Sequence, residues 1–119
     1  MAKTKRTDED WLSDIVHWGE RMSSYLAGID QAAFERDLRT QDAVIRCLEC
    51  IGEASHHLKA SAAADQFSEL ELAEAYWTRN RIMHGYYDLS AARIWSTASG
   101  PAAKFVEKAR LILKAKSAG

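Results

Sequence analysis

The chain has 119 residues and a mass of 13.3 kDa, which is enough for one ordinary domain and too little for two independent cores. Its 47% hydrophobic and 28% charged residues exclude an intrinsically disordered or collagen-like chain. No apolar run approaches the roughly 20 residues of a membrane-spanning helix, and Cys47 and Cys50 are too few for a disulfide scaffold. We therefore expect a soluble, cytoplasmic protein with one domain over residues 1–119, of which residues 1–6 form a flexible basic N-terminus.

The formal net charge of −1 hides an uneven distribution. Residues 1–78 carry eight Lys and Arg against fifteen Asp and Glu, a net charge of −7. Residues 79–119 carry eight against two, a net charge of +6. Such asymmetry can steer a polyanion to one part of the surface. The alternative is that neighbouring helices carry opposite charges and pair with each other.

The first predicted helix begins after Thr7, because three acidic residues follow it and acids stabilise a helix N-terminus. Gly28 is placed to end this helix. Its apolar residues step by four and three and form one stripe, made of Trp11, Ile15, Trp18, Met22 and Tyr25.

A small helix carrying Phe34 and Leu38 is expected next, followed by a longer helix that starts after Thr40. The inward face of the longer helix is predicted to hold Val44, Leu48, Ile51 and Leu58, with Ala54 and Ser55 where helices come close.

The stretch 61–65 is a predicted loop, and Ser68 with Glu71 forms a capping box that opens the next helix. Gly85 is placed to end that helix.

The final helix is expected to begin near Asp88 or Ser90, with a kink or a break at Gly100-Pro101. Apolar residues available for its buried face are Leu89, Ile94, Phe105, Val106 and Leu111–Leu113. One proline, six glycines and no sustained alternation of apolar and polar residues argue against a sheet. The fold class is therefore all-α, an antiparallel up-and-down bundle of four to five helices.

Functional groups are concentrated in the segment 79–87, at the end of a predicted helix. Asn80 and His84 are four residues apart and share a helix face, so the amide can orient the imidazole. Arg79 lies about 100° to the side. A guanidinium beside an imidazole is suited to phosphodiester chemistry, because the cation holds the phosphate while the histidine moves a proton.

The pattern Arg-Asn-x-x-x-His-x-Tyr over residues 79–86 resembles the signature of the HEPN superfamily, in particular the HepT-like toxins that are paired with minimal nucleotidyltransferase (MNT) antitoxins. The stretch 41–54, which ends in Ile-Gly-Glu-Ala, and the residues Tyr87-Asp88 and Ile94-Trp95 are similar to further family segments. The likeness covers residues 10–115. The Pro-Trp pair that the family often has before the motif helix is missing.

This resemblance implies a HEPN-like homodimer in which two motif copies line one cleft, and a ribonuclease toxin that needs no metal and no cofactor. Arg79, His84 and Asn80 are then the catalytic residues acting on RNA, neutralised by an MNT-type nucleotidyltransferase. Tyr86 matches the position that accepts AMP in some HepT-like toxins, while the neighbouring Tyr87 is either a second acceptor or a packing residue. Glu53 either supports Arg79 or pairs with His57.

Other kinds of site and function remain open alternatives. The Cys47–Cys50 pair has C-x-x-C spacing, but it lies inside a predicted helix, where the dipole does not activate a thiol. Glu53 and His56 match one E-x-x-H of a di-iron bundle, but the second copy is missing. A non-catalytic HEPN module that binds a nucleotide or a protein is the main alternative function, and an antitoxin or purely structural bundle is a third.

Overall fold

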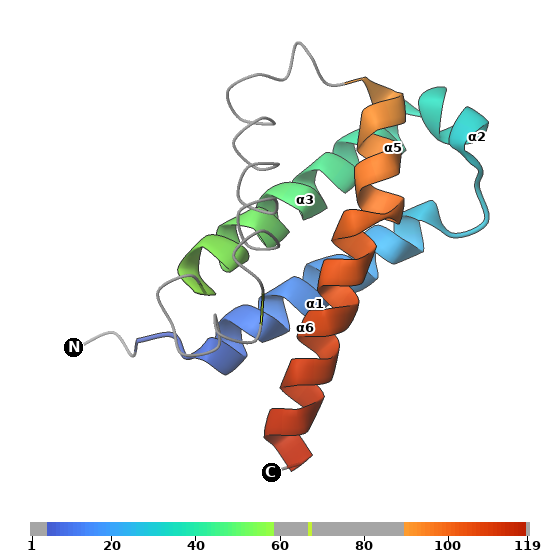
Figure 1. The fold of residues 1–119 in the computed structure, drawn as a ribbon. Helices are drawn as coiled ribbons and strands as arrows, with labels where there is room; N and C mark the ends of the chain where they lie inside the picture. Colours follow the sequence, from blue (N-terminus) through green and yellow to red (C-terminus); the bar gives the residue numbers. More distant parts are fainter. Residues whose placement is uncertain (1–4, 59–66, 68–89, 119) are drawn as a thin grey trace.

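The computed structural model describes residues 5–58, 67 and 90–118, which form five α-helices and no strand (Figure 1). The helices are α1 (Asp8–Leu26), α2 (Gln31–Glu35), α3 (Leu38–Leu58), α5 (Ala91–Ser99) and α6 (Pro101–Ala118). The all-α prediction is confirmed. The helix expected after Ser68 and the loop at 61–65 lie outside the described residues. Across the described ranges, no helix combines the length and the hydropathy needed to cross a membrane.

The N-terminus of α1 is set by a capping box between Thr7 and Asp10. The Thr7 hydroxyl accepts a hydrogen bond from the Asp10 backbone N–H at 3.2 Å, and the Thr7 N–H donates to the Asp10 carboxylate at 2.8 Å. That backbone donor is the main reason why the pKa of Asp10 is lowered. The helix ends at Leu26, and Gly28 forms the turn with a φ of 78°, a value that glycine adopts without strain. Both predicted ends of α1 are confirmed.

The buried stripe of α1 agrees with the expected one at Ile15 and Met22 and differs at its aromatic positions. Its fully buried residues are Leu12, Ile15, Gly19 and Met22. The aromatic residues expected in the stripe are only half-buried; they are Trp11, Trp18 and Tyr25. Both sets have helical spacing, and the smaller side chains take the inner position because α1 is packed on two sides, by α3 and by α6.

The start of α3 is set by Asp37 and not by Thr40. The two Asp37 carboxylate oxygens accept hydrogen bonds from the Thr40 backbone N–H at 3.1 Å and from its hydroxyl at 2.6 Å. The helix therefore begins at Leu38, which is 73% exposed and not part of the small helix. Phe34 of α2 is fully buried and packs against Trp95 of α5, with ring centroids 5.5 Å apart.

The predicted inward face of α3 is confirmed, because all six of its residues are buried: Val44, Leu48, Ile51, Ala54, Ser55 and Leu58. The Ser55 hydroxyl forms its hydrogen bond within α3, where it donates to the Gly52 carbonyl at 2.7 Å. A polar side chain is thus accommodated in the core without a longer-range partner.

The last two helices are separated by a single residue. Ser90 caps α5, and its side chain accepts a hydrogen bond from the Arg93 N–H at 3.1 Å. Of the two predicted starts, Asp88 and Ser90, the second is therefore confirmed. Gly100 ends α5 and Pro101 is the first residue of α6, a position at which the missing N–H of proline costs nothing. The predicted interruption is therefore a one-residue break.

The buried face of these two helices agrees with the expectation except at Leu111; Leu113 is half-buried, and Leu89 lies outside the described residues. Ile94, Phe105 and Val106 are buried, and Phe105 packs against Phe67 with ring centroids 5.0 Å apart. Ile112 is buried as well, whereas Leu111 is 58% exposed because it lies on the opposite side of α6.

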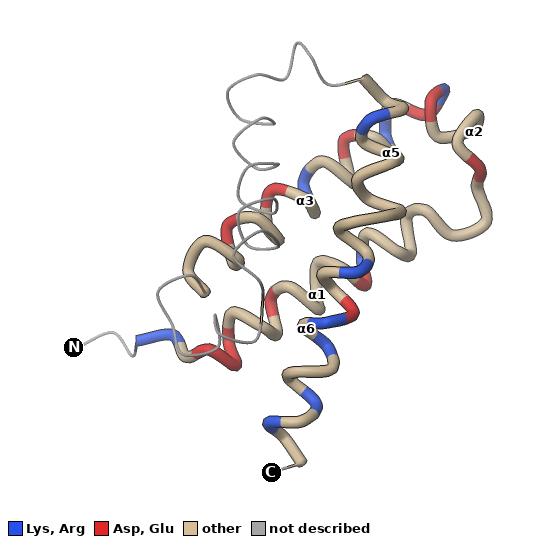
Figure 2. The backbone as a smooth tube through the Cα atoms, in the orientation of Figure 1, with Lys and Arg blue, Asp and Glu red and all other residues tan. Residues whose placement is uncertain are grey.

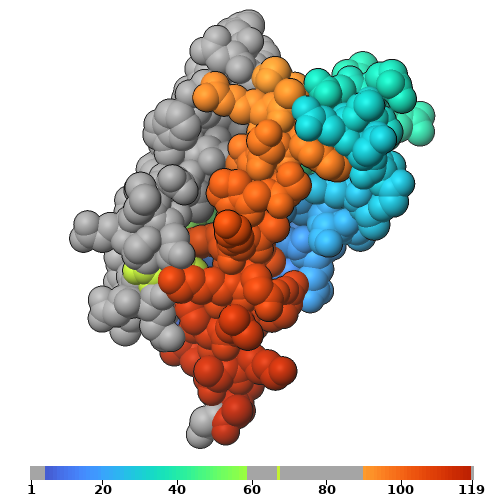
Figure 3. Space-filling model, turned by 45° about the vertical axis from the view of Figure 1, so that its right-hand side comes forward, coloured from blue at the N-terminus to red at the C-terminus, as the bar shows by residue number. Residues whose placement is uncertain are grey.

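α1 runs antiparallel to α3 and to α6, and it lies between them (Figure 1). Trp11 near the start of α1 stacks on His57 near the end of α3. Glu9 faces Lys116 near the end of α6, while Gly19 lies against Val106 further up. Figure 3 shows α5 and α6 as one continuous ridge beside α1 and α2.

Candidate functional site

The predicted catalytic segment lies outside the described residues. This holds for all of its members: Arg79, Asn80, His84, Tyr86 and Tyr87. Their roles stay predictions.

Glu53 is the one predicted site residue that the structure describes. It lies on α3, its side chain is 46% exposed, and its carboxylate oxygen is 3.2 Å from Nε2 of His57. The predicted pair with His57 is therefore present. The second predicted role of Glu53, support of Arg79, remains a prediction.

A groove of about 400 Å³ lies between α1 and α3. We call it the α1–α3 groove; it is lined by Arg6, Trp11, Asp14, Trp18, Arg46, Glu49, Cys50, Glu53 and Ala54. Its walls combine two indoles with charges of both signs. Such a surface suits a partner that offers both apolar area and charges, more than it suits an isolated anion.

Trp11 is held between two cationic or aromatic groups at one end of this groove. The Arg6 guanidinium lies 4.1 Å from the indole centroid, and the His57 ring stacks on Trp11 at 4.0 Å with an interplanar angle of 2°. Arg6 also pairs with Asp14 at 2.9 Å. These contacts hold Arg6 against α1. The sequence carries only one signal of this surface, the seven-residue spacing of Trp11, Trp18 and Tyr25.

Trp18 lies further along the same groove, with two arginines beside it. The guanidinium groups of Arg21 and Arg46 lie 4.9 Å and 5.8 Å from its ring centroid. Arg21 also donates to the Tyr25 hydroxyl at 3.0 Å, which is the main reason why the pKa of Arg21 is raised.

The two cysteines are free thiols on α3. Burial raises the pKa of Cys47 to about 11, and burial also raises the pKa of the half-buried Cys50. A protonated thiol is a poor nucleophile and a poor metal ligand, so Cys47 acts as a small apolar core residue. Within the described ranges, no three His, Cys, Asp or Glu side chains gather as they would around a metal ion.

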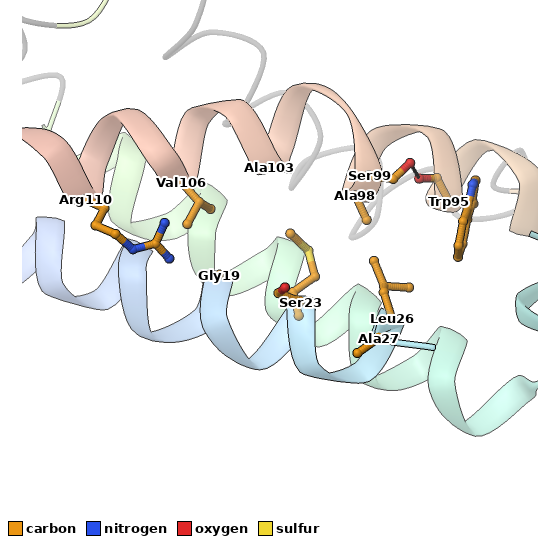
Figure 4. A pocket seen from close by; sticks show the side chains of 11 residues that line it. Gly19, Ser23, Leu26, Ala27, Trp95, Ala98, Ser99, Ala103, Val106 and Arg110 are labelled. Atoms are coloured by element: carbon orange, nitrogen blue, oxygen red, sulfur yellow. Dashed lines mark hydrogen bonds between the residues drawn. The ribbon is translucent and has the colours of Figure 1, made fainter. Parts of the chain in front are cut away.

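A second hollow, of about 430 Å³, lies between α1 and the α5–α6 ridge (Figure 4). Its walls are mainly apolar, with Leu26, Trp95 and Val106 pointing inward, and Arg110 closes one end. The Ser99 hydroxyl donates to the Trp95 carbonyl at 2.7 Å. This hollow offers packing surface and no evident reactive group among the described side chains.

α6 carries more Lys and Arg residues than any other described helix (Figure 2). Its cations are Lys104, Lys108, Arg110, Lys114 and Lys116, against the single acid Glu107. Arg110 pairs with Glu107 and approaches Glu20 of α1 at 3.8 Å, and Lys116 approaches Glu9 at 3.8 Å. The alternative expectation, that oppositely charged helices pair with each other, is therefore confirmed for α1 and α6.

Two lysines of α6 take no part in these ion pairs with α1. Lys104 and Lys114 are exposed, and neither forms an ion pair with any residue of the described part. α6 thus retains positive charge that a polyanion could contact.

Comparison with known proteins places the chain in a family. The sequence profile of the family described as HepT-like, Ribonuclease HepT-like, matches residues 17–109. The chain belongs to the HepT-like ribonuclease family. The matched stretch runs from α1 to α6 and includes the segment 79–87, so the expected HEPN resemblance is confirmed.

Several similar proteins are named as ribonucleases. The chain is 32% identical over 93 residues to "Probable ribonuclease HepT" of Thermococcus cleftensis, which covers 78% of this chain and 84% of the relative. It is 27% identical over 94 residues to "Putative RNase MJ0125" of Methanocaldococcus jannaschii, covering 79% and 80%. It is 25% identical over 109 residues to "Putative RNase MJ1380" of the same organism, covering 92% and 99%. No solved structure matches the chain.

Proposed function

We propose that this protein is the toxin of a HEPN/MNT toxin–antitoxin pair and acts as a metal-independent endoribonuclease in the cytoplasm. The observation that carries the proposal is the family match over residues 17–109, which includes Arg79, Asn80 and His84, together with relatives that are named as ribonucleases. A binding-only module would have no need to keep a histidine beside the arginine.

The proposed reaction is attack of a ribose 2′-hydroxyl on the adjacent phosphate. His84 takes the proton from the 2′-hydroxyl, the 2′-oxygen bonds to phosphorus, and the bond from phosphorus to the 5′-oxygen breaks. His84 of a second copy gives the leaving oxygen its proton. The products are a 2′,3′-cyclic phosphate and a 5′-hydroxyl, and DNA is not a substrate because it lacks the 2′-hydroxyl.

The neighbours of His84 stabilise this reaction. Arg79 binds the phosphate and stabilises the negative charge that builds up on the phosphate oxygens in the transition state. Asn80 orients the imidazole or binds the phosphate. Positive charge on α6, in particular on Lys104 and Lys114, which form no ion pair with the described residues, favours the approach of RNA.

The proposed antitoxin is an MNT-type nucleotidyltransferase that transfers AMP to Tyr86. The phenol oxygen of Tyr86 attacks the α-phosphorus of ATP and pyrophosphate leaves. The added phosphate brings negative charge and bulk two residues from His84, where both oppose RNA binding. Tyr87 is the alternative acceptor.

The test is cleavage of a cellular RNA pool in the presence of EDTA. Wild-type protein, shown by mass spectrometry to carry no AMP, is compared with Arg79→Ala, His84→Ala and the control His17→Ala, which changes an exposed histidine of α1. We expect the first two variants to lose at least about 100-fold in rate and the control to keep its activity. Cleavage by His84→Ala at the wild-type rate would overturn the proposal in favour of a binding module.

A further inference from the structure

Two arginines from different helices meet at one indole ring. Trp18 and Arg21 lie about one turn apart on α1, and Arg46 comes from α3. The guanidinium groups of Arg21 and Arg46 lie 4.9 Å and 5.8 Å from the Trp18 ring centroid. Two positive charges held this close to one point repel each other, and together they attract an anion.

Neither guanidinium is paired with a carboxylate among the described residues. The ion pairs of this part of the chain involve other cations, and both arginines are exposed. The Tyr25 hydroxyl accepts hydrogen bonds from Nε of Arg21 at 3.3 Å and from one of its terminal nitrogens at 3.0 Å. A guanidinium has five N–H donors, so Tyr25 fixes the position of Arg21 and leaves donors for an anion.

Two acidic residues of the α1–α3 groove have partners of their own. The Asp14 carboxylate pairs with Arg6 at 2.9 Å, and the Glu53 carboxylate lies 3.2 Å from Nε2 of His57. These two carboxylates therefore do not neutralise the arginines beside Trp18.

The charges of α3 on either side of Arg46 alternate in sign. Arg39, Asp42, Arg46 and Glu49 follow one another at spacings of three and four residues, which place them along one side of the helix. With Arg21 of α1 added, three cations stand against two anions. The surface beside Trp18 therefore keeps an excess of positive charge.

Trp18 supplies an apolar surface next to these cations. Its side chain is half-buried and lines the α1–α3 groove. Bases of single-stranded RNA stack on aromatic rings and on the planes of arginine guanidinium groups, while cations contact the phosphates. Because the ring and the two guanidinium groups lie together, one nucleotide can use all three.

We propose that Trp18, Arg21 and Arg46 bind a nucleotide of a single-stranded RNA. The base stacks at Trp18, and the neighbouring phosphate lies between the two arginines. We call these three residues the Trp18 site. The inference rests on the proposed function in that RNA is its ligand, and the site adds to the contacts proposed for Arg79 and His84.

An RNA strand suits the Trp18 site better than a free nucleotide does. Both arginines are exposed, so a single nucleotide is not enclosed there. The groove continues from Trp18 to Trp11, seven residues or about 10 Å along α1. A strand therefore gains further contacts along the groove. A duplex does not, because its base faces are already stacked on one another.

The first test measures binding of a labelled single-stranded RNA by fluorescence anisotropy over a range of salt concentrations. All variants carry His84→Ala, so that the RNA stays intact. Arg46→Gln should raise the Kd at least about threefold at low salt and lower the salt slope of the binding constant by about one, because a phosphate contact is lost. Arg36→Gln, which removes the same charge at an exposed position next to α2, is the matched control and should change little.

Trp18 variants test the stacking part of the site. Trp18→Leu should raise the Kd at least about fivefold at every salt concentration and leave the salt slope unchanged, since stacking releases no counterions. Trp18→Phe keeps an aromatic ring and should recover most of the affinity. Circular dichroism shows that both variants are folded.

Glu49→Gln tests the sign of the charge effect. The Glu49 carboxylate lines the groove three residues after Arg46, so its removal should lower the Kd for RNA. A variant that binds RNA more tightly than the parent cannot be explained by damage to the fold.

Competition experiments distinguish a strand from a free nucleotide. Unlabelled single-stranded RNA should displace the labelled RNA at a far lower concentration than AMP or a duplex RNA. Displacement by AMP or by the duplex at the same concentration as the single strand would overturn the assignment to an RNA strand.

The Trp18 site is refuted if Arg46→Gln binds like Arg36→Gln, or if Trp18→Leu binds like the parent. RNA cleavage by the chain with His84 intact reports separately on the proposed function. Cleavage without an effect of Arg46 and Trp18 on binding refutes only the Trp18 site. Binding that depends on these residues without any cleavage refutes only the ribonuclease.

Discussion

Gly19 of α1 lies directly under Val106 of α6. A Cβ atom on Gly19 would stand 2.2 Å from Cγ1 and 2.6 Å from Cγ2 of Val106, well inside van der Waals contact. Figure 4 shows the Val106 side chain pointing at this glycine. Both residues are buried, so the close approach of α1 and α6 depends on the missing side chain.

Gly19→Ala should therefore destabilise the fold even though alanine is the better helix former. We expect a loss of about 1–3 kcal/mol in the free energy of unfolding, because the two helices must move apart. Urea denaturation followed by circular dichroism measures it. Ser23→Ala, on the exposed side of the next turn, is the control and should change little; a Gly19→Ala variant as stable as the control would show that the helices are not in contact here.

The raised pKa of Cys47 predicts a pH dependence of stability. The thiol has a pKa of about 11 in the folded chain against 9.0 for an unperturbed cysteine. Between these values the unfolded chain releases the proton and the folded chain keeps it, so the free energy of unfolding falls as pH rises from 9 to 11. Below pH 9 both states are protonated and this contribution is constant.

Comparison with Cys47→Ala isolates this effect, since other groups titrate alike in both proteins. The variant is less stable at pH 8, because it leaves a small cavity. Its deficit should shrink by about 2 kcal/mol between pH 9 and pH 11. Denaturation curves at five pH values across this window measure the deficit, and a deficit that stays constant would mean that the Cys47 thiol titrates normally.

The exposed lysines Lys104 and Lys114 of α6 predict a specific effect on RNA binding. Lys104→Gln and Lys114→Gln should each weaken binding of a single-stranded RNA to the His84→Ala variant and reduce the salt slope of the binding constant by about one. Fluorescence anisotropy at several salt concentrations measures both quantities. Arg36→Gln, which removes an exposed charge next to α2, is the control; equal loss in all three variants would point to net charge and not to a contact on α6.

Much of the fold was predictable because local signals were unambiguous. Thr7 stands before three acidic residues, a pattern that predicts its cap, and Ser90 and the Gly100-Pro101 break carry equally clear signals. The sequence does not single out Asp37, because Thr40, three residues later, is also a good capping residue; in the structure Thr40 donates to Asp37.

The buried stripe of α1 could not be chosen from periodicity alone. Trp18 and Gly19 are neighbours, and a bulky indole has the stronger hydrophobic signal. Gly19 is buried because Val106, 87 positions later in the chain, needs the space. A contact between such distant residues leaves no trace in the spacing of either helix.

For the predicted site too, contacts within one helix could be predicted from spacing and contacts between helices could not. The pair between Glu53 and His57 follows from four-residue spacing and is present. The stack of His57 on Trp11 joins α3 to α1 and could not be predicted from spacing. The roles of Arg79, Asn80 and His84 depend on the family resemblance and stay predictions.

The chemistry of the cut ends tests the central claim most directly. A synthetic RNA is incubated with wild-type protein in EDTA, and the fragments are weighed by mass spectrometry. Attack by the 2′-hydroxyl, with Arg79 and His84 in the proposed roles, yields a 2′,3′-cyclic phosphate on one fragment and a 5′-hydroxyl on the other. Fragments that carry a 3′-hydroxyl and a 5′-phosphate would mean attack by water, and would contradict the proposed mechanism.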